Sequence, residues 1–346
     1  MQKRILICTA QVPFARGGNE LLSDGLRDAL RAAGHLAEIV ALPYAWQPHD
    51  QIAPSALAWR LLDLTQIDGQ PIDQLICTKF PSYAARHPRK VVWLVHQHRQ
   101  AYDWYGTPLS DFANTDADRA LREQIVRMDR ATLGEAHARF AISANIAGRL
   151  MRYTGLSAAP LYPPSRYAGR LRAGPYGDYL LSDARLDKSK RIDLLLEALA
   201  RTRQPVPCVI VSAGAEREAL ERLAGRLGLR ERVSFRGFVD DETLIALYAE
   251  ARAVAYLPLD EDYGFTTVQA LEAARPLITT EDAGGALELI SHGQGGLIAA
   301  PAPDAIAAQI DLLWQTDDAA PRIGAAGPAR ARGITWEKVI RALVMV

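Results

Sequence analysis

Residues 179–199, YLLSDARLDKSKRIDLLLEAL, begin as a short apolar strand, continue as a basic loop and end as an amphipathic helix. The apolar run is bounded by polar residues, which is typical of a buried strand, and leucines recur at helical spacing after the loop. Strands that alternate with helices in this way indicate a parallel, doubly wound sheet. The sequence therefore predicts an α/β fold.

Two such series lie along the 346 residues, which is long for one ordinary domain. Between them, residues 161–177, LYPPSRYAGRLRAGPYG, are rich in Pro and Gly and predict a linker. We expect two Rossmann-like domains with a cleft between them, over residues 1–165 and 166–330, and a final helix in 331–346 that packs back on the first domain. The expected strands are 4–10, 36–42, 73–78, 90–95 and 139–143, then 178–184, 206–213, 232–238, 253–259, 276–280 and 295–300, with helices over 18–33, 221–232 and 242–251.

Composition narrows the function classes. Lys plus Arg number 40 and Asp plus Glu number 40, so the formal charge is zero, which argues against nucleic acid binding by bulk electrostatics. Cys8, Cys77 and Cys208 are isolated in apolar runs, which favours core thiols in a reducing compartment over disulfides or a metal site. The N-terminal apolar run is short for a signal sequence, and no window approaches the roughly 20 residues of a membrane span. We expect a cytoplasmic protein.

Ligands of open parallel sheets bind beyond the carboxyl ends of the strands, so we expect the ligand-binding residues in the loops that follow the strands. After the first strand, Gly17 and Gly18 open a helix, and paired glycines let backbone N–H groups approach an anion or a sugar. A tight turn without a ligand fits them equally well. His96 ends a later strand, and His98, Arg99, Tyr102 and Asp103 follow it, a cluster that favours a site over structural roles.

Three loops of the second series carry further candidates. Arg185 and Lys190 precede a helix, where two cations suit a diphosphate, although a solvated basic loop fits them as well. Glu261 lies three residues before Gly264, and a helix is expected to begin near 266–267. The carboxylate could bind sugar hydroxyls, or it could simply be stabilised by the helix dipole. A last glycine pair, Gly284 and Gly285, precedes another helical segment.

In this order and at this spacing, the segments resemble the retaining glycosyltransferases of family four, the group 1 glycosyltransferases, which have the two-domain GT-B fold. The resemblance runs along nearly the whole chain and is most specific in its C-terminal half. It rests on GGNELLSDGLRDALRAAGH, His96, ARLDKSKRIDLLLEAL, EDYG and EDAGGALELISHGQGGLIAAP.

The resemblance implies a role for each matching residue. Arg185 and Lys190 correspond to the basic pair at the donor's diphosphate, Glu261 to the acid that contacts the transferred sugar, and His96 to a histidine that reaches that sugar from the first domain. Gly17 and Gly18 match the glycine loop near the phosphates and the acceptor. The other implied donor-binding residues are Phe238 and Val239 at the base, Gly264, Phe265 and Thr266 at the sugar or phosphates, Gln269 at the ribose, and Gly284 and Gly285.

This sequence departs from the family pattern at three places. The second acid of the E-x-F-G-x4-E motif is Gln269 here, Tyr263 replaces the usual Phe, and the phosphate-side turn is VSAG at residues 211–214. Because a charged hydrogen bond is about twice as strong as a neutral one, Gln269 predicts a loss of about 1 kcal/mol in nucleotide affinity. We expect Gln269→Glu to tighten nucleotide binding if Gln269 faces the ribose.

The implied function is transfer of a hexose from a GDP- or UDP-sugar to a hydroxyl of a glycan, a lipid-linked glycan or a small molecule, with retention and without a cofactor or divalent metal. Asp116 and Asp118 form a D-x-D, which we expect to cap a helix. A non-catalytic nucleotide-sugar-binding relative is the alternative. An NAD-dependent oxidoreductase is a weaker alternative, because no predicted strand is followed by a GxGxxG motif with an acid about 20 residues further on. Peripheral membrane contact stays open, with one short basic cluster at residues 86–90.

Overall fold

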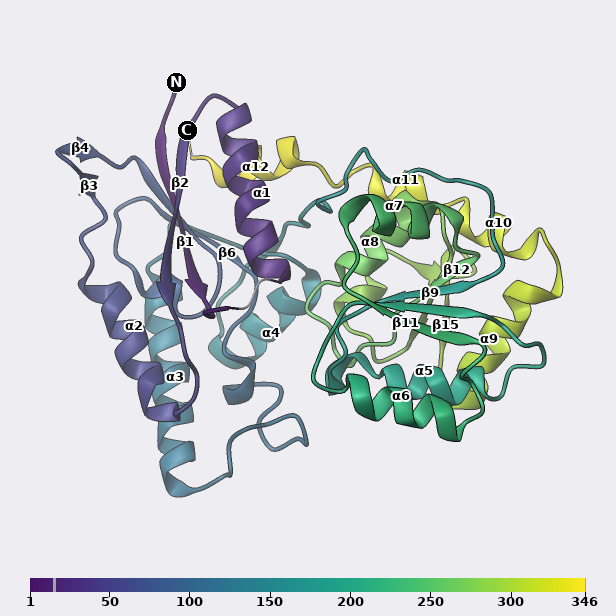
Figure 1. The fold of residues 1–346 in the computed structure, drawn as a ribbon. Helices are drawn as coiled ribbons and strands as arrows, with labels where there is room; N and C mark the ends of the chain where they lie inside the picture. The colour runs from purple at the N-terminus through teal and green to yellow at the C-terminus, as the bar shows by residue number, and fades with distance from the viewer. Residues whose placement is uncertain (15–16, 346) are drawn as a thin grey trace. The chain divides into compact units, whose positions relative to one another are not determined.

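The computed structural model describes residues 1–14 and 17–345. The chain divides into two units, Met1–Arg166 with Ile334–Val346, and Tyr167–Gly333 (Figure 1). The first crossing from one unit to the other lies inside the predicted linker. Each unit contains one large parallel sheet with helices around it, so the predicted α/β class is confirmed.

The sheet of the first unit has six strands in the order β2-β1-β5-β6-β7-β8, and all neighbours are parallel. Its inner strands β5 and β6 are buried along their whole lengths, which explains the apolar runs that follow Gln74 and Lys90. The strands are β1 (Arg4–Gln11), β2 (Leu36–Pro43), β5 (Gln74–Cys77), β6 (Lys90–Leu94), β7 (Ala138–Ala141) and β8 (Ala159–Pro160); β3 (Gln66–Ile67) and β4 (Gln70–Pro71) form a separate hairpin. The helices are α1 (Gly18–Ala32), α2 (Ile52–Leu61), α3 (Asp116–Gly134) and α4 (Ala144–Thr154).

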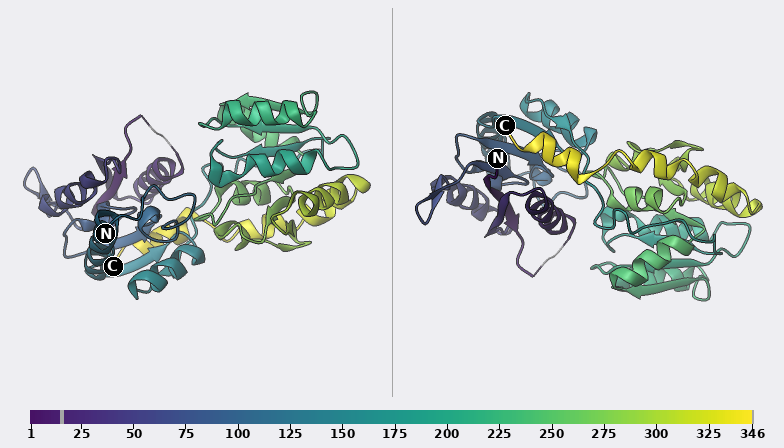
Figure 2. Two further views of the ribbon diagram at one scale, coloured as in Figure 1. Left: turned by 90° about the horizontal axis from the view of Figure 1, so that it is seen from below. Right: turned by 90° about the horizontal axis from the view of Figure 1, so that it is seen from above.

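Helix α12 (Trp336–Leu343) belongs to the first unit, although it follows the second along the chain (Figure 2). Its side chains Val339 and Leu343 are fully buried. The Trp336 ring lies edge-on to Trp93, with 6.2 Å between ring centres, and the amide of Gln74 donates to the Leu343 carbonyl at 2.6 Å. These contacts attach the helix to α1 and to the sheet of the first unit.

The sheet of the second unit has seven strands in the order β11-β10-β9-β12-β13-β15-β14. From β9 the chain builds outward through β10 and β11, and then returns to the other side of β9 with β12. The switch point of the sheet therefore lies between β9 and β12, which is where ligands of such sheets bind. The strands are β9 (Leu180–Asp183), β10 (Cys208–Val211), β11 (Val233–Gly237), β12 (Ala253–Ala255), β13 (Leu277–Thr280), β14 (Ser291–His292) and β15 (Gly295–Ala299).

Helices cover both faces of this sheet. Figure 1 shows α5, α6 and α9 on one face and α7, α8 and α11 on the other. The predicted helix over 221–232 is wrong in its second half, because α6 ends at Arg226 and Gly228 follows with φ +71°, a left-handed conformation that stops a helix. The helices are α5 (Ile192–Leu199), α6 (Arg217–Arg226), α7 (Asp241–Glu250), α8 (Phe265–Glu272), α9 (Pro303–Gln315), α10 (Ala319–Gly324) and α11 (Gly327–Ala331).

Candidate functional site

Lys190 and Glu261 meet at the switch point of the second unit. Lys190 lies on the loop after β9 and Glu261 on the loop after β12, and their side chains form an ion pair. The Tyr256 hydroxyl donates to Glu261 Oε2 at 2.7 Å and lies 3.4 Å from Lys190 Nζ. The side chains of Lys190 and Glu261 are only 12% and 16% exposed, so the pair is largely shielded from water.

Tyr256 keeps its proton in this cluster. Burial, with the negative charge of Glu261 beside it, raises the pKa of Tyr256 well above its ordinary value. The phenol therefore remains a donor to Glu261 at any physiological pH, and it fixes the direction in which the carboxylate points.

Arg185 has a more open position on the same loop. Its side chain is 72% exposed, and one terminal nitrogen lies 3.4 Å from the Asp187 carboxylate. Asp187 is itself held by the amide and hydroxyl of Ser189, at 3.0 and 2.6 Å. Arg185 thus offers an accessible guanidinium beside the shielded Lys190.

Arg191 joins the three loops that follow β9, β12 and β13. Its guanidinium donates to both oxygens of Asp282, at 2.7 and 2.8 Å, and to the carbonyls of Leu257 and Pro258. Burial alone would raise the pKa of Asp282, but hydrogen bonds from Arg191 and Thr280 lower it below its ordinary value. Arg191 therefore positions the loop of Glu261 rather than facing solvent.

The glycines of these loops permit close backbone contact. Gly264 precedes α8 with φ +84°, and a Cβ on Gly285 would lie 2.5 Å from the Asp262 carbonyl. The Gly285 amide donates to the Glu261 carbonyl at 2.7 Å. Gly284, φ +62°, bridges to Glu261. These glycines hold the Glu261 loop, and their contact with a sugar or phosphate stays a prediction.

Other predicted donor-binding residues lie at the same edge of the sheet. Phe238, just beyond β11, is 86% exposed and can stack on a base, while Val239 packs partly against the core. The Phe265 ring lies edge-on to Tyr263, with 5.3 Å between ring centres. Thr266 donates its hydroxyl to the Asp183 carbonyl at 2.8 Å, which ties the start of α8 to the end of β9.

Gln269 is buried on α8, 7% exposed. Its Oε1 lies 2.9 Å from the hydroxyl of Tyr248, and the same hydroxyl lies 3.0 Å from Asp183 Oδ2. Gln269 therefore shares a tyrosine with a carboxylate that the sequence did not single out.

In the first unit, His96 follows β6 and is partly exposed, with Nδ1 2.8 Å from the Gln97 carbonyl. The residues after it are largely buried or paired within the first unit, and their role in a site stays a prediction. His98 is buried 3.2 Å from the Tyr44 hydroxyl, and burial lowers the pKa of His98 to about 3. Tyr102 is also buried, and Arg99 pairs with Asp103.

Gly17 caps the start of α1, and its amide donates to Glu20 Oε2 at 2.9 Å. Gly18 is the first residue of that helix and is exposed. Beyond the end of β5, the buried Lys79 lies with Nζ 3.4 Å from Glu20 Oε1. Glu20, which holds the Gly17 amide, is therefore also paired with Lys79, an interaction that the sequence did not indicate.

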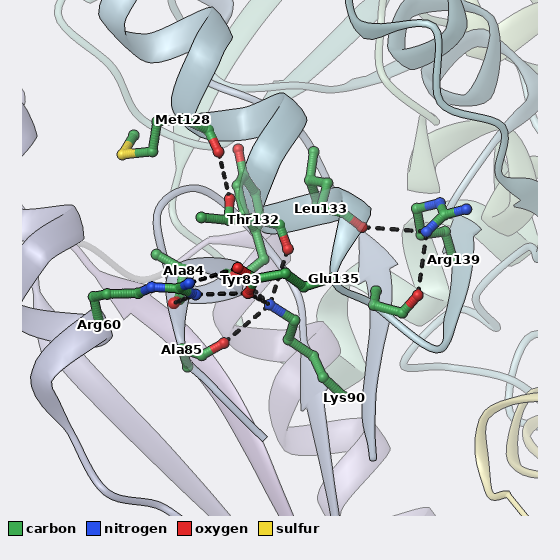
Figure 3. A network of polar contacts seen from close by, with 11 residues as sticks. Arg60, Tyr83, Ala84, Ala85, Lys90, Met128, Thr132, Leu133, Glu135 and Arg139 are labelled. Atoms are coloured by element: carbon green, nitrogen blue, oxygen red, sulfur yellow. Dashed lines mark hydrogen bonds and ion pairs between the residues drawn. The ribbon is translucent and has the colours of Figure 1, made fainter. Parts of the chain in front are cut away.

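The basic cluster at residues 86–90 exposes fewer positive charges than its sequence suggests. Lys90 is buried, and it donates to the carbonyls of Tyr83, Ala85 and Thr132 at 2.9 to 3.0 Å and to Glu135 at 3.2 Å (Figure 3). Arg60 also pairs with Glu135. Within residues 1–14 and 17–345, no helix has the length and apolar character needed to cross a bilayer.

The D-x-D acts as a helix cap, as expected. Thr115 accepts a hydrogen bond from the Asp118 amide at 3.2 Å, and Asp118 Oδ2 accepts one from the Thr115 amide at 3.2 Å. Among the described residues, no three His, Cys, Asp or Glu side chains are grouped as a metal site would need.

Comparison with known proteins shows which family the second unit resembles. Residues 174–330 match the family described as glycosyl transferases group 1. This part of the chain is similar to the group 1 glycosyl transferases. It is 30% identical over 190 residues to D-inositol 3-phosphate glycosyltransferase of Streptomyces griseus, 51% of this chain and 40% of that protein. Its matches span 35% to 40% of the length of three curated relatives.

Solved structures extend the likeness to the fold of the whole chain. Sucrose-phosphate synthase from Thermosynechococcus elongatus superposes with a TM-score of 0.80 at 18% identity, over 99% of this chain and 97% of that one. Anabaena HepE, solved with UDP and glucose, gives 0.72 at 18% identity, over 99% and 98%. The GT-B fold predicted from the resemblance is confirmed.

Sequence reasoning missed three residues around the candidate site, Tyr256, Asp183 and Arg191, and it also missed Lys79 in the first unit. Tyr256 falls in a run that was assigned wholly to a strand, and Asp183 is the last residue of a strand. Arg191 lies in the stretch predicted as a basic loop, while Lys79 follows an apolar strand. Asp183, Lys79 and Tyr256 are polar residues at or just beyond the carboxyl end of a strand, which is the signal that could have found them.

Proposed function

We propose that this protein is a retaining glycosyltransferase that moves a hexose from a nucleotide diphosphate sugar to a hydroxyl acceptor. The observation that carries the proposal is the meeting of Lys190 and Glu261 at the switch point of the second unit, with Arg185 exposed beside them. A cation pair suits a diphosphate, and a carboxylate suits sugar hydroxyls, so one edge of the sheet supplies both halves of a nucleotide sugar site.

In the proposed reaction the bond between the anomeric carbon and the diphosphate oxygen breaks, and a bond to the acceptor oxygen forms on the same face of the sugar. The acceptor proton passes to an oxygen of the leaving phosphate, so no protein nucleophile is needed. Negative charge grows on the diphosphate, where Arg185 and Lys190 stabilise it without a divalent ion. Glu261 would hold the sugar hydroxyls, and contact of His96 with the sugar stays a prediction of the family resemblance.

The donor and acceptor classes are supported by what the comparison proteins are named for. HepE was solved with UDP and glucose, which supports a UDP-sugar, and a GDP-sugar is the second candidate. The relatives include enzymes named for inositol 3-phosphate and for mannosylfructose phosphate. We propose a hydroxyl of a glycan, a lipid-linked glycan or a small molecule as the acceptor.

The first experiment measures the shift in melting temperature with UDP, GDP, ADP and their sugars. We expect one diphosphate and its sugar to stabilise the protein, and no shift with any of them would contradict the proposal. Donor hydrolysis or transfer by the stabilised protein then separates an enzyme from a non-catalytic nucleotide-sugar-binding relative.

The second experiment compares donor turnover by Arg185→Ala and Lys190→Ala with turnover by Lys188→Ala, all in EDTA. Lys188 lies on the same loop and serves as the matched control. Removing one preorganised donor at developing charge typically costs about 10²-fold in kcat. We expect losses of that order for Arg185→Ala and Lys190→Ala and full activity for the control. Wild-type turnover by both site variants would remove them from the mechanism.

A further inference from the structure

Asp183 is a carboxylate at the switch point that the proposed mechanism does not yet use. It is the last residue of β9, two positions before Arg185, and its backbone carbonyl is fixed by the Thr266 hydroxyl at 2.8 Å. Its Oδ2 lies 3.0 Å from the hydroxyl of the fully buried Tyr248. Both its backbone and its side chain are therefore held in place at the edge where ligands of such sheets bind.

The Tyr248 hydroxyl joins Asp183 to Gln269. It lies 2.9 Å from the amide group of Gln269 and has one proton to donate. Donation to the charged Asp183 is the stronger choice, and Gln269 can then turn its NH2 group toward the hydroxyl oxygen. A glutamate at 269 has no such option, because it would offer a second acceptor and place two negative charges around one hydroxyl.

Asp183 and Gln269 thus form a pair with a single negative charge. A ribose carries two adjacent hydroxyls, and a carboxylate at the end of a parallel strand is a common partner for them in α/β sheets. A diphosphate held by Arg185 and Lys190 leaves its ribose close by, because the two groups are covalently adjacent in a nucleotide. Asp183 lies on the same strand and loop as those cations.

We propose that Asp183 binds the ribose hydroxyls of the nucleotide and that Gln269 supports it as a neutral partner. This inference rests on the proposed function, because it concerns the nucleotide of the same site. It also reverses one expectation from the sequence: Gln269→Glu would weaken binding, since it adds a second carboxylate to the one that Asp183 already supplies.

The test measures dissociation constants by calorimetry for UDP or GDP, whichever wild type binds, and for its 2′-deoxy and 3′-deoxy forms. The variants are Asp183→Asn, Gln269→Glu and the double exchange Asp183→Asn with Gln269→Glu. We expect wild type to prefer the ribonucleotide about tenfold, a difference of about 1.4 kcal/mol. Asp183→Asn loses that preference, and Gln269→Glu alone weakens binding. The double exchange restores the preference by returning one charge to the pair.

Tyr248→Phe is the matched control for a purely structural role. It removes the hydrogen bond that orients Asp183 but leaves the carboxylate, so part of the preference for ribose remains. A Tyr248→Phe variant that loses the preference as fully as Asp183→Asn would overturn direct contact. Equal binding of ribo- and deoxynucleotides by wild type would overturn the inference even if no variant folds, whereas no nucleotide binding at all would contradict the proposed function instead.

Discussion

Asp129 is a fully buried carboxyl in the first unit. Its Oδ2 accepts a hydrogen bond from the Tyr102 hydroxyl at 2.6 Å, while Oδ1 has no partner among the described residues. Burial raises the pKa of Asp129 from 3.8 to about 7, despite hydrogen bonds that act in the opposite direction. The folded state therefore favours the protonated acid, whose O–H can donate within this cluster.

The residue-scale prediction concerns pH. Between about pH 4 and pH 7 the folded protein retains a proton on Asp129 that the unfolded chain releases, so stability falls as pH rises through that window. The largest loss, above pH 7, is about 4 kcal/mol. Asp129→Asn cannot ionise and should lose less stability than wild type between pH 5 and pH 8 in urea unfolding. An identical decline in both proteins would contradict the assignment.

At the same scale, the sequence predicted the charges of the site but not their partners. Arg185, Lys190 and Glu261 could be found because each follows a strand and precedes a helix. The pairing of Glu261 with Lys190 depends on which strands are neighbours in the sheet, and the local sequence pattern does not predict strand order. Tyr248 could not be found from the sequence because it lies on the buried face of a helix, where a tyrosine is typical of the core.

Three loops act together at the scale of elements, and Arg191 is their common contact. Its partners are 66 to 91 positions away along the chain, so its neighbours in sequence gave no indication of its role. The alternation of strands and helices was predictable from local apolar patterns, whereas contacts among loops arise only when parallel strands bring their carboxyl ends to one edge. Cys8 and Cys77 illustrate this, because they are isolated in sequence yet face each other in β1 and β5.

The element-scale prediction is that Arg191→Lys lowers the free energy of unfolding by about 2 kcal/mol, because lysine keeps the charge but loses the two-pronged bond to Asp282. Arg201→Lys is the control, since the ion pairs of Arg201 with Glu197 and Asp304 are exposed and contribute little. Urea unfolding measures both. Equal stability of the two variants would show that Arg191 does not hold the loops.

For the whole molecule, the decisive feature is that the chain leaves the first unit after Arg166 and returns to it at Ile334. Helix α12 fills a place on α1 where Gly25 lies, and a Cβ on Gly25 would meet the Trp336 ring at 2.6 Å. The sequence predicted an apolar-faced final helix, but the need for glycine opposite a tryptophan 311 positions later follows only from the packed structure.

The prediction at this scale uses two helical glycines. Gly25→Ala should destabilise the protein by about 1 to 3 kcal/mol, because the added methyl group forces the Trp336 ring to move. Gly148→Ala, on α4 with open space around it, should instead stabilise by up to about 1 kcal/mol, because alanine favours helices. Thermal unfolding distinguishes them, and a stabilising Gly25→Ala would mean that α12 does not dock closely.

The return of α12 also has a consequence for how the protein is made. Residues 334–345 leave the ribosome only after all of the second unit has emerged. Until then, the first unit lacks its last helix. During that interval the amide of Gln74 and the ring of Trp93 lack their partners from α12. The first unit can therefore complete its fold only after the second has been synthesised, and ribosome-bound chains that stop before Trp336 should expose an apolar surface to chaperones.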